Sequence, residues 1–158
     1  MLPQLRPYAE RVRRGLAAKP WPELITLVRE GPPAWSAVRL PPLDAAVNTV
    51  EFFVHHEDVR RAADGWQPRT LGPDFQDTLW RRLRTTGRLM MRRVPVGVVF
   101  RRPDGGEVVA KAATPPVILS GLPSELVLFA YGRQGHARVE LAGDAELVDQ
   151  LRTAKLGL

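Results

Sequence analysis

Glu51 and His55 are the two residues of this sequence whose types and spacing best suit metal chemistry. Four positions apart on a helix, a carboxylate and an imidazole lie on one face and reach the same point. A carboxylate combined with a neutral imidazole suits zinc, iron or nickel. Asp58 follows His55 by about one helical turn, where its carboxylate can orient the imidazole through the second ring nitrogen. We therefore predict that Glu51 and His55 are metal ligands and that Asp58 supports His55.

The same helix carries a polar stripe that we expect to face the protein interior. At about 100° per residue, the polar residues fall within roughly 80° of one another, with apolar residues on both flanks. The stripe is Asn48, Glu51, His55 and Asp58, and the flanks are Val47, Val54, Phe52 and Val59. The opposite face, which we expect in water, is Thr49, His56, Glu57 and Arg60. A buried Glu–His hydrogen-bonded pair without a metal explains the same spacing, and this alternative stays open.

Two ligands are fewer than a catalytic zinc site requires, because such a site has three protein ligands and an open position. Residues 1–43 contain no histidine, and the carboxylates there are Glu10, Glu23 and Glu30. The third ligand is therefore one of these, or it belongs to a preceding segment. His56 points about 100° away from His55, and His136 precedes a predicted strand, so we expect both outside the site. The chain has no cysteine, so a thiol nucleophile would have to be a small molecule.

The elements that must position these residues divide into a helical half and a mixed half. Helices are predicted over 8–17, 21–30, 44–63 and 73–94, with Asp44 as the cap of the third and Pro95 as the stop of the fourth. Strands follow at 96–102, 107–112, 116–120 and 137–141, with helices at 123–131 and 145–155. The fold class is therefore α+β. We predict a helical metal-binding domain over residues 1–94 and a small α+β domain over residues 95–158.

The net charge of +6 bears on the choice of partner. The positive charge is almost all arginine, and the basic pairs are spread along the chain. A nucleic-acid binder usually concentrates such residues, so we expect solvated arginines and no nucleic-acid partner. No stretch reaches the roughly 18 apolar residues of a membrane span, and no signal peptide opens the sequence. We expect no membrane partner and a cytoplasmic location.

The run Glu51-Phe52-Phe53-Val54-His55-His56-Glu57-Asp58-Val59-Arg60-Arg61-Ala62 resembles the third bundle helix of a known superfamily. This is the DinB / mycothiol-dependent maleylpyruvate isomerase superfamily, and the likeness is strongest to an uncharacterised metal-binding subgroup. Segments in the same order support it over essentially the whole chain: Gly31-Pro32-Pro33-Ala34-Trp35-Ser36, Pro95-Val96-Gly97-Val98-Val99, Gly132-Arg133 and Gly143-Asp144. The resemblance implies a partial DinB-like helical bundle followed by a small sterol-carrier-like α/β domain.

The resemblance also implies a three-residue metal site, of which Glu51 and His55 match the second and third ligands and Asp58 matches a recurrent aspartate. The first ligand, a histidine on an early helix, has no counterpart, so we expect the chain to be truncated at its N-terminus or its start to be assigned at an internal methionine. The implied cofactors are a divalent metal, zinc foremost, and mycothiol as a co-substrate.

Three functions compete at this point. The first is a metal-dependent and mycothiol-dependent isomerase or S-transferase with an incomplete metal site in this chain. The second is a non-catalytic protein that binds a metal or a small-molecule ligand. The third, suggested only by charge, is a protein that binds nucleic acid or another anionic partner. Because the missing bundle helices would leave the apolar flanks uncovered, we also expect self-association, with a homodimer as its simplest form. These flanks are Val47, Val54, Phe52 and Val59.

Overall fold

The computed structural model describes residues 6–31 and 41–156, with the backbone alone over residues 41–47. The described residues form six helices and one four-stranded mixed sheet, so the predicted α+β class is confirmed. The chain divides into two compact units, Met1–Ala45 and Ala46–Leu158. The second unit therefore extends across residue 94, where the sequence suggests a domain boundary.

The first unit contains two short helices, α1 (Arg6–Ala17) and α2 (Trp21–Glu30). Both agree with the predicted helices. Pro20 precedes α2 in an extended conformation, and Gly31 ends it with a φ of 72°, a left-handed value that only glycine adopts without strain. These breaks are the ones that the proline and glycine positions predict.

The second unit contains most of α3 (Pro41–Arg61) and all of α4 (Pro73–Met90), α5 (Pro123–Ala130) and α6 (Ala145–Thr153). Helix α4 continues through Thr85-Thr86-Gly87, where both threonine hydroxyls hydrogen-bond back to Arg82 O on the preceding turn. Gly87 is needed at its position, since a Cβ there would lie 3.1 Å from the ring of Phe100. No helix in the described part of the chain is long and apolar enough to cross a membrane.

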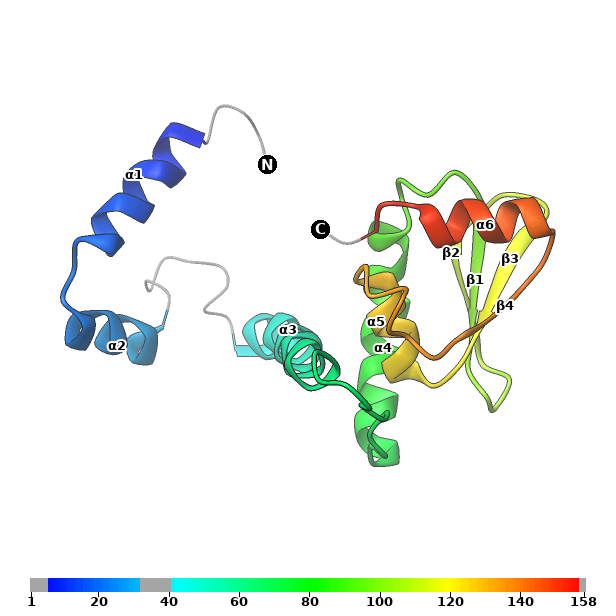
Figure 1. Cartoon of the computed structure of the whole chain (residues 1–158), viewed down its shortest axis with the longest axis horizontal. Coiled ribbons are helices and arrows are strands. Elements are labelled where there is room, and N and C mark those ends of the chain that lie inside the picture. Colours follow the sequence, from blue (N-terminus) through cyan, green and yellow to red (C-terminus); the bar gives the residue numbers. More distant parts are fainter. Residues whose placement is uncertain (1–5, 32–40, 157–158) are drawn as a thin grey trace. The chain divides into compact units, whose positions relative to one another are not determined.

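The sheet consists of β1 (Gly97–Arg101), β2 (Glu107–Lys111), β3 (Pro116–Ser120) and β4 (Glu140–Ala142), in the order β2-β1-β3-β4. Strand β1 pairs antiparallel with β2 and parallel with β3, and β4 pairs antiparallel with β3. Alternate residues of the central strands are buried, among them Phe100 and Leu119. Helix α4 packs against α5 and β2, and α6 packs against β3 (Figure 1).

Several expectations about local structure are corrected. Helix α3 begins at Pro41, so Asp44 is a residue of the helix and not its cap, and α4 ends at Met90 and not at residue 94. The last strand covers Glu140–Ala142 and not 137–141. The reason is that the backbone N–H of Arg138 donates to the carboxylate of Glu125 at 2.8 Å, which diverts this segment from strand pairing. Helix α3 also buries a face other than the predicted one, and this decides which of its residues line the candidate site.

Candidate functional site

Helix α3 buries a different face from the predicted one. Its buried side chains are Val50, Phe53, Val54, Glu57 and Arg61, which recur at the three-residue and four-residue spacing of one helical face. Phe52 and Val59 are 72% and 76% exposed. Glu51 and His55 are exposed, and Asp58 is half-buried. The expectation that the polar stripe faces inward, and that Glu57 lies in water, is therefore wrong for this unit.

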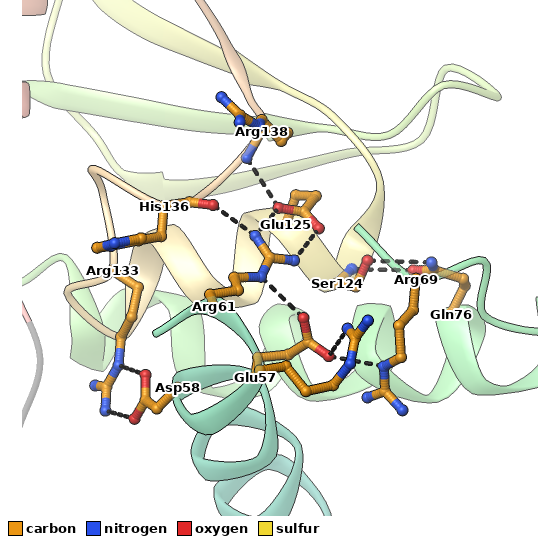
Figure 2. Close-up of polar contacts among 11 residues, drawn as sticks. Glu57, Asp58, Arg61, Arg69, Gln76, Ser124, Glu125, Arg133, His136 and Arg138 are labelled. Atoms are coloured by element: carbon orange, nitrogen blue, oxygen red, sulfur yellow. Dashed lines mark hydrogen bonds and ion pairs between the residues drawn. The ribbon is translucent and has the colours of Figure 1, made fainter. Parts of the chain in front are cut away.

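The guanidinium of Arg61 is the centre of the buried face. Its Nε donates to Glu57 Oε2 at 2.8 Å, within α3. Its two terminal nitrogens donate to Glu125 of α5 at 2.8 and 2.6 Å, a bidentate pair (Figure 2). Glu57, Arg61 and Glu125 are each 5% exposed or less, so the three charges are withdrawn from water together.

Further hydrogen bonds satisfy the remaining capacity of these three groups. Arg69 Nε donates to Glu57 Oε1 at 2.7 Å, and Arg60 reaches the same oxygen at 3.2 Å. Arg61 also donates to the carbonyl of His136 at 2.5 Å. Both carboxylates therefore have partners on both oxygens, which is the condition under which buried charge is tolerated. We call Glu57, Arg61, Arg69 and Glu125 the buried ion network.

Trp66, which follows α3, stacks between two arginines. The guanidinium carbon of Arg61 lies 4.5 Å from the centre of its ring, and that of Arg138 lies 4.7 Å away. Both distances are within the range of cation–π attraction. The indole therefore covers the buried ion network and adds a second type of contact to the same guanidinium.

The pKa of Glu57 shows which effect dominates in this network. Burial raises the pKa of Glu57, but hydrogen bonds from Arg61 and Arg69 and their charges lower it further, so it lies below its ordinary value. A carboxyl whose pKa is depressed on folding stabilises the fold above its unfolded pKa, and this contribution is lost as the pH falls through the folded value. The network is therefore strongest at neutral pH and weakens in acid.

Asp58 forms a second ion pair between α3 and the loop after α5. Arg133 donates to its two carboxylate oxygens at 2.8 and 2.5 Å. This bidentate pair is the main cause that holds the pKa of Asp58 below its usual range. Asp58 Oδ2 also lies 3.7 Å from Nδ1 of His55, too far for a good hydrogen bond. Asp58 thus lies near His55, as predicted, but the main partner of Asp58 is Arg133.

Glu51 and His55 line one small cavity, together with Val54, Tyr131 and Arg133. Its volume is about 150 Å³, which accommodates an ion with its waters but not the whole of a drug-sized ligand. The structure thus places both predicted ligands in one cavity wall. His55 remains 69% exposed, so a ligand bound there would stay in contact with water.

Tyr131 contributes a phenol to the wall of this cavity. Burial, and then the negative charge of Glu51, raise the pKa of the Tyr131 phenol above its ordinary value. The phenol is therefore protonated at neutral pH, and it forms a hydrogen bond with the hydroxyl of Thr86. Arg133 is the cation of the cavity wall, and its charge is largely balanced by Asp58.

The donor set for a metal is incomplete in the part of the chain that the structure describes. No group of three histidine, cysteine, aspartate or glutamate side chains there is placed to hold a metal ion. His56 is exposed, and His136 lies in the loop before β4, as predicted. The described residues thus fit two metal ligands, Glu51 and His55, and water or another donor would complete the coordination.

The sequence prediction missed the buried ion network. A signal for half of it was present, because Glu57 and Arg61 are four residues apart on the same face as Val50 and Phe53. No local pattern could have identified Glu125, which is 64 residues from Arg61. Residue spacing likewise could not predict that Tyr131 and Arg133 line the cavity, because both are far from Glu51 and His55 in the sequence.

Comparisons with protein-family models, with curated protein sequences and with solved structures found no match to this chain. Its own structure defines it as an α+β protein with a buried ion network and a small cavity at α3.

We predict that Arg61→Leu lowers the free energy of unfolding by about 3–5 kcal/mol, because it leaves Glu57 and Glu125 buried without their shared partner. The matched control is Arg60→Leu on the same helix, because the contact of Arg60 with the network is one longer hydrogen bond, 3.2 Å, to Glu57. It should cost at most about 1 kcal/mol. Urea denaturation at neutral pH measures both, and equal losses would contradict this account of Arg61.

Proposed function

We propose that this chain is a metal-binding protein that uses Glu51 and His55 as two ligands of a divalent cation, zinc foremost. The observation that carries the proposal is that the two side chains, one helical turn apart, line one cavity of about 150 Å³. Their oxygen and nitrogen donors suit zinc. Because the donor set is incomplete among the described residues, we expect weak binding, with water in the open positions.

We also propose a family for the two halves of the fold. On the motifs around Glu51 and His55, the helical part would be a partial DinB-like bundle and the part after residue 95 a small sterol-carrier-like domain. In the structure, the residues on both sides of this boundary belong to one compact unit, Ala46–Leu158. The proposal assigns the protein to the mycothiol-dependent isomerase and thiol-transferase group, and its support is the residues themselves.

A metal at this position would lower the pKa of a bound thiol and hold it as the thiolate. The chain has no cysteine, so the thiol would be a small molecule such as mycothiol. Arg133, which lines the cavity, would then attract an anionic group of the thiol. The second candidate is a non-catalytic protein that binds a metal or small ligand in the same cavity, which the small volume of the cavity favours.

We expect His55→Ala and Glu51→Gln to weaken zinc binding by about tenfold or more, since even outer partners of a metal ligand contribute about 10–100-fold. The control is His56→Ala, because His56 is exposed and lies outside the cavity. Isothermal titration with zinc, backed by metal analysis of the purified proteins, measures the effect. Equal loss in the His55 and His56 variants, or none in either, would exclude the assignment.

The choice between thiol chemistry and plain metal binding is tested by proton release. A thiol that binds the metal is deprotonated, so adding mycothiol to the zinc-loaded chain should release about one proton per thiol bound. Titration in buffers of different ionisation enthalpy reports this number without any turnover. Zinc binding that depends on His55, combined with no proton release, would support the non-catalytic candidate and end the thiol proposal.

A further inference from the structure

Helix α4 places a row of arginines on the surface of the second unit. Arg81, Arg84 and Arg88 are exposed, and Arg92 continues the row in the turn that follows the helix. At about 100° per residue, Arg81, Arg84 and Arg88 fall within roughly 60° of the helix circumference, and Arg92 lies just beyond the end of the helix at Met90. Spacings of three and four residues put successive guanidiniums on neighbouring turns. The arginines that look scattered in the sequence are therefore gathered on one helical face.

The arginines of this row have no acidic partner among the described residues, which is also true of Arg82, Arg93, Arg138 and Arg152. Arg61, Arg102 and Arg133 each have at least one carboxylate within hydrogen-bond distance. Within residues 6–31 and 41–156, no ion pair involves Arg81, Arg84, Arg88 or Arg92, and Arg81 bonds only to the hydroxyl of Thr78. Like charges one turn apart destabilise a helix by about 0.2–0.5 kcal/mol per pair. The row is therefore positive from Arg81 onward, whereas Asp74 and Asp77 occupy the same face of α4 in the turns before it.

A further cation extends the row at its C-terminal end. Lys111 of β2 donates to the carbonyl of Arg92 at 3.1 Å and also to the carbonyl of Val94. Its ammonium thereby neutralises the partial negative charge of the chain segment that ends α4. The carbonyls just after the C-terminal end of α4 would repel an anion, and the ammonium of Lys111 offsets this repulsion.

The packing of α4 restricts what can bind to this face. The opposite face is buried in the core through Leu79, Leu83 and Met90. A helix that lies in a membrane surface must insert its apolar face, and here that face is already occupied. The row is thus a mainly polar surface, although Leu89, the residue after Arg88, is an exposed apolar side chain.

We infer that the outer face of α4 binds the phosphate backbone of a nucleic acid, independently of base sequence. Guanidiniums four residues apart rise by about 6 Å per step, so the row extends over roughly 16 Å. A nucleic-acid strand offers a regular line of phosphates over that length, about one every 3.4 Å along the duplex axis. The two aromatic residues of α4, Phe75 and Trp80, are not exposed, so this face has no platform for stacking bases.

The inference is independent of the metal proposal, because none of its residues lines the cavity at Glu51 and His55. Fluorescence anisotropy with a labelled DNA duplex of about two helical turns, added to the full chain, is the direct test. With four phosphates contacted, we expect a dissociation constant of about 10⁻⁴–10⁻⁶ M and a log–log salt slope of about −3 to −4.

The decisive variant is the triple change Arg84→Gln, Arg88→Gln and Arg92→Gln. It should weaken binding by about tenfold or more and reduce the salt slope to about −1, because three of the four phosphate contacts are removed. The matched control changes Arg11, Arg29 and Arg152 to glutamine, three exposed arginines on other helices, with the same loss of net charge. Thermal unfolding of both variants checks that each remains folded.

Three outcomes would overturn the inference. One is that the wild-type chain shows no salt-dependent binding to the duplex. Another is that the two triple variants lose affinity equally, which would mean that net charge alone is responsible. The third is that the chain binds vesicles containing phosphatidylserine but not the duplex, which would identify a membrane surface as the partner.

Discussion

The guanidinium of Arg61 lies between two carboxylates, one a turn earlier on α3 and the other on α5. A charge withdrawn from water in this way is tolerated only if it is paired and its hydrogen-bonding capacity is filled. Glu57 and Glu125 supply the pairing, and Arg69, the carbonyl of His136 and the backbone of Arg138 complete the network. The rotation of α3 about its axis depends on this arrangement, because no other rotation would bring Glu57 and Arg61 to Glu125.

That rotation decides where the candidate site lies. With Val50, Phe53 and Arg61 facing inward, the residues about 100° further round the helix come to the edge of the buried face. Glu51 and His55 are at this edge, where they line a small cavity with Tyr131 instead of lying in the core. The bond from Arg133 to Asp58 holds the loop after α5 beside the same cavity. The buried ion network on one face of α3 thereby positions the cavity with Glu51 and His55 on the neighbouring face of the same helix.

The sequence predicted the elements well, because their limits are set by local chemistry. Pro20 and Gly31 bound α2, Asp144 caps α6 by accepting the N–H of Glu146, and the turn before β2 contains two glycines. The buried face of α3 was predicted wrongly because hydropathy assigns Glu57 and Arg61 to water. Whether a charged side chain is buried depends on a distant partner, here Glu125, and no local pattern contains that partner. The last strand was misplaced for the same reason, since its start depends on the bond from Arg138 to Glu125.

The central claim is that Arg61 and Glu125 are energetically coupled across the unit, and a double-mutant cycle measures this coupling directly. Arg61→Met, Glu125→Gln and the double variant are compared with the wild-type chain by urea denaturation at neutral pH. Since each single change leaves a buried partner unpaired and the double change leaves fewer charges behind, the double variant should be more stable than the sum of the single effects predicts. We expect a coupling free energy of about 1.5–3 kcal/mol. Additivity to within about 0.5 kcal/mol would show that the pair does not hold α3 in place.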